Sequence, residues 1–259
     1  CPPGTVPDTS RGSAGTAGST ASGGAAGTTG STAPSCVPSS SVGSTGTGAT
    51  GAGAAVGGGS GTGITGLINQ TCDIADHSRE WKTSEINQAG EKGVTPRFFV
   101  IAVDGLSIIV NEKNSLEKLT MAQVGALYRG EIKNWKALGG PDKAVSLYGR
   151  QSNSGTYVFM QEHVLGNKNY STDMKEMNGN AQIIESVIQD EGAVGYVGVG
   201  YLYDKDGKIR SGLKILNISK DPNGQAYSPL DKEAVDTKKY PVSRPLYQAV
   251  NGKPSGEIA

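Results

Sequence analysis

The stretch GRQSNSGT, residues 149–156, lies between the apolar residues 145–148 and a helix-like stretch that ends near Gly166. The apolar residues have the length and composition of a buried strand. Ser154 is a residue type that caps helix N-termini. A strand followed by a polar loop and a helix is the repeating unit of α/β folds, in which ligands bind where strands end and helices begin. The sequence therefore predicts an α/β fold with a candidate ligand loop at residues 149–156.

Strands and helices alternate through the chain from Ile64 onward. Apolar, β-branched stretches predict strands, and capping residues or apolar stripes at helical spacing predict helices. This alternation favours largely parallel sheets. The strands are expected at residues 98–103, 106–110, 145–148, 194–199 and 213–218, and the helices begin near Thr83, Thr120, Ser154, Asn180 and Ser228.

Residues 1–63 have a different composition. They contain no Leu, Ile, Phe, Tyr, Trp, Met or Lys, and their only charged residues are Asp8 and Arg11. A segment made mostly of Gly, Ala, Ser and Thr buries too little apolar surface to fold by itself. This composition predicts a flexible linker.

The chain opens on Cys1 without a preceding Met or signal sequence. Such a start is typical of a processed bacterial lipoprotein, whose first cysteine carries the lipid. The alternative is a chain boundary that coincides with a cysteine. If Cys1 is lipidated, Cys36 and Cys72 are left as a candidate disulfide in an oxidising compartment.

The bulk composition argues against several classes of protein. Lys plus Arg and Asp plus Glu are both 24, so the net charge is zero, whereas a nucleic-acid-binding protein usually carries a basic excess. No run of 18 apolar residues is present to span a membrane. Three cysteines without a CxxC pair, and two histidines, offer few zinc ligands. We expect no metal, no cofactor and no nucleic-acid partner.

The loop at residues 149–156 has the composition of an oxyanion site. A helix N-terminus presents unpaired N–H groups and a partial positive charge. Arg150 adds a charged planar donor, Ser154 and Thr156 add hydroxyl donors, and Gly155 allows close approach of the backbone. From these residues alone, the alternative is an ordinary helix cap with Arg150 on the surface.

Seven segments resemble, in order and spacing, those of the phosphate-binding proteins of ABC-type phosphate transporters. The resemblance covers about residues 58–259 and implies the type II periplasmic-binding-protein fold, with two α/β lobes and a ligand cleft between them. The segments are GGGSGTGI, DIADHSR, AVDGLSIIVN, GEIKNWKALGG, YGRQSNSGTYVF, GAVGYVGVGY and YPVSRPLYQAVNGKP.

The resemblance also implies a domain division and a function. Residues 1–23 become a flexible tether, residues 24–105 with 200–259 become lobe I, and residues 106–199 become lobe II. The implied function is capture of inorganic phosphate and its delivery to the membrane permease of an ABC transporter, without catalysis. The implied location is extracytoplasmic, in the periplasm or on the outer face of the cell membrane. A lipid anchor at Cys1 belongs to this expectation only if the chain is a processed lipoprotein.

The resemblance carries over to individual residues. Ser78 falls where many family members place a carboxylate that accepts the phosphate proton. The acceptor here is therefore a hydroxyl, a backbone carbonyl or another carboxylate such as Asp76. The resemblance assigns phosphate binding to Ser31, Thr32, Ser60, Ser78, Arg79, Arg150, Ser154, Gly155 and Thr156.

Three other functions remain open from the sequence. One is a structural or surface-layer role, if the Gly/Ser/Thr-rich region is extended. The serine at position 78 keeps open a binding protein for another oxyanion, such as sulfate, molybdate or a phosphonate. A phosphohydrolase using Asp73 or Asp76 would need a metal cluster or an activated nucleophile, and neither is legible in the sequence.

Overall fold

A computed structural model of the chain describes residues 36–37 and 58–254, all within one compact unit, Ser31–Ala259. The tether expected at residues 1–23, and Ser31 and Thr32, lie outside the described residues. Cys72 is disulfide-bonded, and the Cys36 side chain also lies outside the part that the structure describes.

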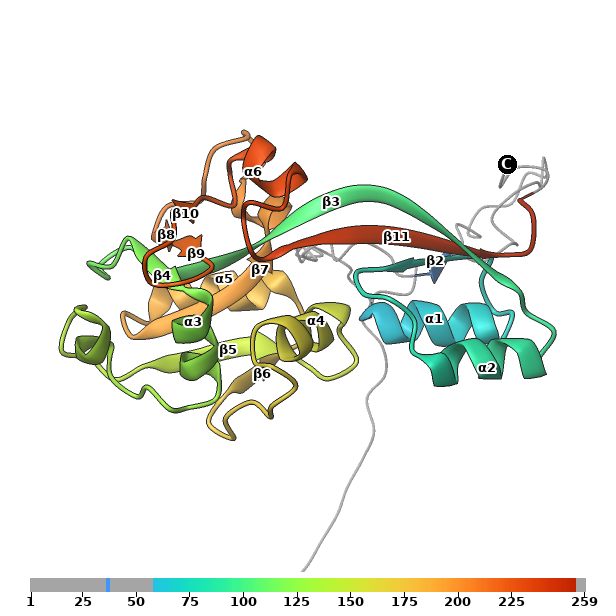
Figure 1. The fold of residues 1–259 in the computed structure, drawn as a ribbon, viewed down its shortest axis with the longest axis horizontal. Helices are drawn as coiled ribbons and strands as arrows, with labels where there is room; N and C mark the ends of the chain where they lie inside the picture. Colours follow the sequence, from blue (N-terminus) through green and yellow to red (C-terminus); the bar gives the residue numbers. More distant parts are fainter. Residues whose placement is uncertain (1–35, 38–57, 255–259) are drawn as a thin grey trace, which may run out of the picture. The chain divides into compact units, whose positions relative to one another are not determined.

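Figure 1 shows the described strands and helices, and the short 3₁₀ helices are named η in the text. In chain order they are β1 (Cys36–Val37), α1 (Ser60–Ile68), β2 (Ile74–His77), α2 (Thr83–Glu91), β3 (Pro96–Asn111), β4 (Lys118–Thr120), α3 (Met121–Tyr128), η2 (Trp135–Leu138), β5 (Ser146–Arg150), α4 (Gly155–His163), β6 (Lys175–Met177), α5 (Asn180–Gln189), β7 (Ala193–Gly198), η3 (Val199–Leu202), β8 (Leu213–Ile215), β9 (Asn217–Ser219), β10 (Ala226–Tyr227), α6 (Lys232–Asp236) and β11 (Ser243–Asn251).

The long strand β3 joins the two halves of the main sheet, whose strand order is β1-β2-β11-β3-β7-β5-β6. Its first part pairs with β11, and its second part, from Leu106 onward, pairs with β7 and β8. Figure 1 shows β3 and β11 side by side. They run from the part of the molecule that contains α1 and α2 to the part that contains the other helices. A second, three-stranded sheet has the order β10-β9-β4.

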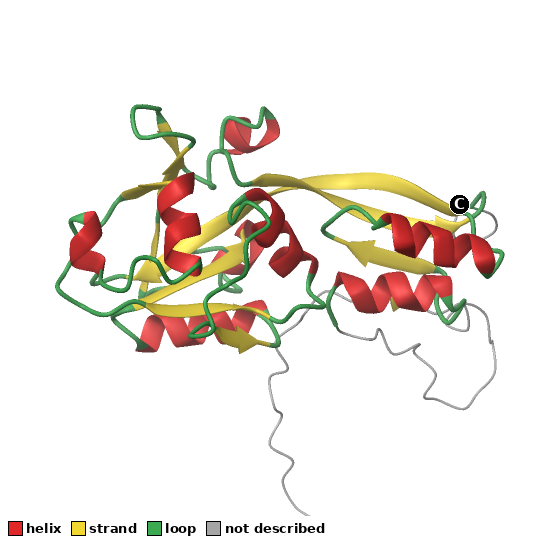
Figure 2. Ribbon diagram, turned by 60° about the horizontal axis from the view of Figure 1, so that its bottom comes forward, coloured by secondary structure: helices red, strands yellow, loops and turns green. Residues whose placement is uncertain are grey.

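Helices pack on both halves of the main sheet (Figure 2). α1 contacts β2 and β11, and α5 contacts β7, β5 and β3. The first half has its own buried cluster, which includes Ile64, Leu67 and Ala249. Within the described ranges, no helix combines the length and the apolarity needed to cross a membrane.

Residues between β8 and β11 contribute to the core of the second half. Leu216, Ile218, Val235 and Tyr240 are buried in the same cluster as Leu106 of β3. The division expected from the sequence gives residues 200–259 to lobe I. Because these residues pack in the second half, we propose that they belong to lobe II and that the chain re-enters lobe I only with β11.

Four of the five expected helix starts are confirmed, at Thr83, Thr120, Ser154 and Asn180. Thr120 caps α3 by accepting a hydrogen bond from the Gln123 backbone N–H, and Ser154 caps α4. The helix start at Ser228 is wrong. α6 begins at Lys232 because the carboxylate of Asp231 accepts the N–H of Ala234.

Three expectations about strands are also wrong. Most strand pairs in the described part are antiparallel, because β3 leaves the first half of the sheet and β11 returns to it in the opposite direction. Residues 98–103 and 106–110 form one strand, since Asp104 pairs with Arg244 of β11 instead of turning the chain. Residues 213–218 form two short strands, β8 and β9, which pair with β3 and with β4.

Gly195 of β7 gives a test of how tightly α5 packs on the sheet. A Cβ at this position would lie 2.5 Å from Cγ2 of Ile183 and 3.0 Å from Cγ2 of Val187, both on α5. Gly195→Ala should therefore lower the free energy of unfolding by about 1–3 kcal/mol, the usual cost of overpacking.

The matched control is Gly90→Ala in α2, where an added Cβ meets no atom within 4 Å. This change should raise stability by up to about 1 kcal/mol, because alanine is the better helix former. Urea unfolding of the three proteins measures both effects. Equal stability of Gly195→Ala and the parent chain would contradict the packing.

Candidate functional site

One cavity brings together six of the residues expected to bind an anion. It is lined by Ser60, Ser78, Arg150, Ser154, Gly155 and Thr156, among others. Ser60 opens α1 and Ser78 follows β2, whereas Arg150 ends β5 and the other three open α4. The cavity therefore lies between segments that belong to different parts of the main sheet.

Three helices begin at this cavity. α1 starts at Ser60, α4 follows its cap Ser154, and α5 starts at Asn180, and all three residues line the cavity. The caps of α1 and α5 are Gly59 and Gly179, and neither supplies a side-chain hydrogen bond. In α1 the N–H groups of Gly61 and Thr62 donate to the carbonyls of Asn153 and Gly59, whereas the first N–H groups of α5 have no capping side chain. The helix starts bring partial positive charge to the cavity.

Arg150 carries a buried charge that no side chain in the described part of the chain neutralises. It is 6 % exposed, and its Nε is buried without a hydrogen-bond partner. Within the described ranges, its guanidinium makes neither an ion pair nor a hydrogen bond. Burial lowers the pKa of Arg150, but a guanidinium stays protonated in proteins. A buried charge without a partner is costly, so the site favours an anion beside Arg150.

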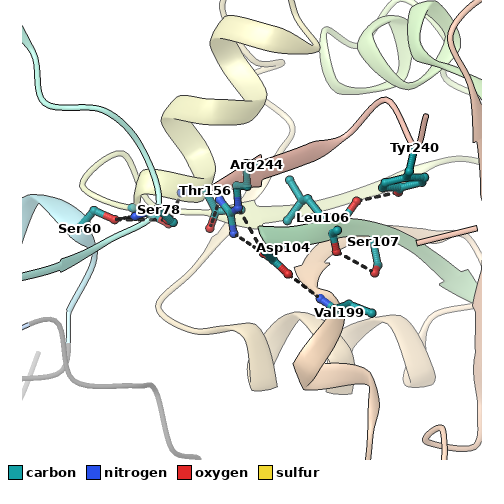
Figure 3. A network of polar contacts seen from close by, with 11 residues as sticks. Ser60, Ser78, Asp104, Leu106, Ser107, Thr156, Val199, Tyr240 and Arg244 are labelled. Carbon is teal, nitrogen blue, oxygen red and sulfur yellow. Dashed lines mark hydrogen bonds and ion pairs between the residues drawn. The ribbon is translucent and has the colours of Figure 1, made fainter. Parts of the chain in front are cut away.

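A second guanidinium lies in the same cavity and does have a partner. Arg244 Nε and Nη2 donate to Oδ2 of Asp104 at 3.2 and 3.0 Å, and both residues are buried. Oδ1 of Asp104 accepts the N–H of Val199 at 3.2 Å. Arg244 Nη1 donates to the hydroxyl oxygen of Thr156 at 3.0 Å, as Figure 3 shows. The Thr156 proton is therefore free to point elsewhere.

The two sides of the cavity touch through small residues. The hydroxyls of Ser60 and Ser78 are 3.3 Å apart, and the Ser78 N–H donates to the Ser60 hydroxyl at 3.1 Å. A Cβ on Gly155 would lie 2.3 Å from Oγ of Ser60 and 2.7 Å from Oγ of Ser78. The N–H of Gly61 donates to the carbonyl of Asn153 at 3.1 Å. Glycine at position 155 thus lets the start of α4 approach both serines.

Comparison with known proteins agrees with this geometry. A family model described as a PBP superfamily domain matches residues 14–259. The chain belongs to the PBP superfamily. This confirms the family and the fold class, two-lobed α/β, that the sequence predicts.

Curated relatives and solved structures of this superfamily carry phosphate in their names. Phosphate-binding protein PstS of Staphylococcus aureus is 32% identical over 198 residues, which are 75% of this chain and 58% of the relative. PstS of Staphylococcus epidermidis is 33% identical over 192 residues, 73% of this chain and 57% of the relative. The chain thus spans less than two thirds of the length of these relatives.

Two solved structures cover more of their own chains. A protein of Clostridium perfringens, assigned as a phosphate ABC transporter substrate-binding protein and solved with bound phosphate, has a TM-score of 0.65 and 29% identity, and the match covers 77% of this chain and 74% of that one. An ABC-type phosphate transport receptor of Vibrio cholerae has a TM-score of 0.58 and 27% identity, with 78% and 76% covered.

The structure does not bring Arg79 into the cavity of this PBP-superfamily chain. Its guanidinium donates to both carboxylate oxygens of Glu85, at 2.8 and 2.6 Å, and to the carbonyl of Glu80. Arg79 is not among the lining residues. A second guanidinium is present nonetheless, and Arg244 supplies it from the other end of the chain.

The polar lining residues Asp104, Asn180 and Arg244 are among those not singled out from the sequence as binding residues. Asp104 and Arg244 lie within two of the segments that carry the family resemblance, AVDGLSIIVN and YPVSRPLYQAVNGKP. Asn180 was recognised only as a helix start, and its Oδ1 is buried without a partner. A charged residue between two apolar stretches, such as Asp104, is the signal that could have pointed to the Asp104–Arg244 pair, because an acidic side chain is almost never buried without a partner.

Asp76 also lines the cavity, whereas Asp73 does not. Burial raises the pKa of Asp76, although a hydrogen bond with Gln248 opposes the shift. Its Oδ1 is buried without a hydrogen-bond partner. Asp76 is therefore an unsatisfied acceptor in a cavity otherwise rich in donors.

His77 forms the wall next to Ser78. It is 4 % exposed, lies 2.7 Å from the Arg79 carbonyl through Nδ1, and stacks on Tyr247 with 5.0 Å between ring centroids. Its Nε2 has no partner. Burial lowers the pKa of His77 below the ordinary 6.5, so the folded protein favours the neutral ring.

This burial predicts a pH-dependent stability. When the folded pKa is depressed, the unfolded state binds the extra proton, so stability falls as the pH drops below about 6.5. His77→Asn should reduce this dependence, since the amide keeps a donor for the Arg79 carbonyl but does not titrate. His163→Asn is the control that should keep the dependence. Urea unfolding from pH 7.5 to 5 measures it, and parallel curves for His77→Asn and the parent would refute the role of His77.

The buried Asp104–Arg244 pair predicts a large effect on stability. Asp104→Ala leaves Arg244 without its partner and should destabilise the fold by about 3–5 kcal/mol. The exposed pair Lys232–Asp236 provides the control, because Asp236→Ala should change stability by less than about 1 kcal/mol. Denaturant unfolding of both variants decides the point, and similar effects of the two changes would contradict the burial argument.

Proposed function

We propose that this protein captures inorganic phosphate in the cavity and delivers it to the membrane permease of an ABC transporter. The observation that carries the proposal is the buried Arg150 guanidinium, which has no ion-pair or hydrogen-bond partner among the described residues and lines a cavity where three helices begin. The names of the relatives, which bind or transport phosphate, supply the identity of the anion.

The charges of the lining residues suit an anion. Arg150 and Arg244 contribute two positive charges, and Asp104 neutralises one of them by its ion pair with Arg244. The Asp76 carboxylate also lines the cavity, and burial raises its pKa, which disfavours its negative charge. The helix N-termini add partial positive charge. A tetrahedral oxyanion has enough oxygen atoms to accept from Arg150, from the start of α4 and from the Ser60 and Thr156 hydroxyls. Such charge-assisted hydrogen bonds are about twice as strong as neutral ones.

The same cavity contains acceptors that sulfate could not use. Hydrogen phosphate carries a proton, and sulfate at neutral pH has none to donate. The Asp76 carboxylate and the Ser78 hydroxyl are the candidates to accept that proton. A buried acceptor left unpaired costs about 1–3 kcal/mol, so this group would favour a protonated oxyanion. A binding protein for another oxyanion is the alternative function.

The proposal includes location and the absence of catalysis. We place the protein outside the cytoplasm, as a solute-binding protein and not an enzyme, in keeping with relatives named for binding and transport. The phosphohydrolase alternative would use Asp73 or Asp76, and Asp73 lies away from the cavity lining. The described residues contain no group of three or more His, Cys, Asp or Glu side chains arranged to hold a metal ion.

Calorimetric titration with phosphate and with sulfate tests the proposal. Arg150→Ala should weaken phosphate binding by about 100-fold, and Thr156→Val by about tenfold, from the loss of charge-assisted and hydroxyl hydrogen bonds. The matched controls are Arg97→Ala and Thr95→Val, which change exposed residues of the same types and should leave the affinity unchanged.

The outcomes separate the alternatives. Tight phosphate binding with weak sulfate binding supports the proposal. Preference for sulfate or molybdate moves the function to another oxyanion, and the absence of any oxyanion binding by the folded parent chain would refute it. Turnover of a chromogenic phosphate ester, abolished by Asp76→Asn, would favour the phosphohydrolase.

A further inference from the structure

The Arg150 backbone is held by a tyrosine from a neighbouring strand. The last paired positions of β5 and β7 are Leu147 and Val194, so the Arg150 N–H lies beyond this ladder. It donates instead to the hydroxyl oxygen of Tyr196, on β7, at 2.9 Å. Tyr196 is fully buried, so water does not compete for this bond, which is stronger in a low-dielectric interior.

The Tyr196 hydroxyl also makes a second hydrogen bond. It lies 3.5 Å from the hydroxyl of Tyr170, which in turn donates to the Tyr157 carbonyl at 2.8 Å. A phenol has one proton, and Tyr170 uses its proton on this carbonyl, so Tyr196 is the donor between the two hydroxyls. At 3.5 Å this bond is long and weak. Tyr157 lies in the first turn of α4, so the chain of hydroxyls connects Arg150 to the helix that opens at the cavity.

The packing around Tyr196 leaves its hydroxyl little freedom. A Cβ on Gly149 would lie 2.8 Å from that hydroxyl and 2.5 Å from Sδ of Met174. The rings of Tyr128 and Tyr196 have centroids 5.2 Å apart, edge to face. Burial raises the pKa of Tyr196 to about 12. The phenol therefore stays protonated and keeps its place against the loop that carries Arg150.

We propose that Tyr196 is a positioning residue of the oxyanion site. Its hydroxyl fixes the backbone from which the Arg150 guanidinium projects, and through Tyr170 it fixes that backbone relative to the start of α4. Arg150 and the α4 N-terminus then face one ligand in a fixed geometry. Such supporting contacts hold binding groups within a fraction of an ångström and lower the ordering cost of binding. The inference rests on the proposed phosphate-binding function.

The test compares two tyrosines by calorimetric titration with phosphate. Tyr196→Phe removes the acceptor of the Arg150 N–H and should raise the Kd by about tenfold. Tyr240→Phe is the matched control, because the Tyr240 hydroxyl is equally buried and donates to the Leu106 carbonyl at 2.7 Å. It should destabilise the fold similarly and leave the Kd within about twofold.

A double-mutant cycle separates positioning from general damage. In an Arg150→Ala background, Tyr196→Phe has no guanidinium left to position and should weaken phosphate binding by no more than about twofold. A purely structural role would instead give the same weakening in both backgrounds. Equal weakening, or an unchanged Kd for Tyr196→Phe alone, overturns the proposal.

Two further outcomes are distinguished by design. If the parent chain does not bind phosphate, the proposed function fails, and the cycle is run with sulfate or molybdate. If none of these anions binds, the positioning role fails too. If Tyr196→Phe does not fold, Tyr170→Phe replaces it, because that side chain is only partly buried. It should raise the Kd by about threefold, and an unchanged Kd overturns the proposal.

Discussion

The antiparallel register of β3 and β11 is the constraint on which the site depends. In this register Arg244 lies directly opposite Asp104. Two residues further along β3, the Leu106 N–H donates to the Val242 carbonyl at 2.9 Å. A slip of one residue would turn every side chain of the strand to the other face of the sheet. The guanidinium and the carboxylate would then be buried apart from each other, at a cost of several kcal/mol. The ion pair and the strand pairing therefore specify the same register.

The register also decides what the cavity can hold. Because Arg244 is occupied by Asp104, it contributes mainly by donating to the Thr156 hydroxyl and fixing which way that group can donate. Among the described residues, no carboxylate pairs with Arg150, so its charge remains available for a ligand. The two arginines thus have different roles: one organises the donors, and the other provides the unneutralised charge. We propose a third role for Tyr196, whose hydroxyl positions the backbone that carries Arg150.

Local sequence signals were sufficient for much of the fold and part of the site. Capping residues such as Thr120 and Ser154 act within one turn of helix, so their effect can be read from neighbouring letters. The anion loop around Arg150 was identifiable for the same reason, and the family resemblance selected it over an ordinary cap. The resemblance assigned binding to Ser60 and Ser78, whose loops have only a weak local signal, and the structure places both residues at the same cavity.

The remaining features depend on contacts between distant parts of the chain. Asp104 reads locally as a break between two apolar stretches, and only its pairing with Arg244, 140 positions away, allows one continuous strand. The resemblance assigns Arg79 to the binding site, but in the structure both terminal nitrogens of its guanidinium donate to the Glu85 carboxylate. Side-chain charge is visible in a sequence, but whether a charge is already neutralised is a property of the packed structure.

The donors and the acceptors of the cavity have different consequences for ligand binding. Helix N-termini, hydroxyls and a free guanidinium bind any oxyanion of suitable charge, so these donors give affinity with little selectivity. Selectivity depends on the few acceptors, because a site that leaves a buried acceptor unpaired rejects a ligand far more strongly than a site that merely lacks one contact. Asp76 is such an acceptor, with one oxygen buried and unpartnered and with its pKa raised by burial. A carboxylate that protonates more readily would lose this discrimination as the pH falls, since its protonated form can donate to sulfate. On the proposed function, affinity and selectivity therefore rest on different residues of one cavity, and they can change independently.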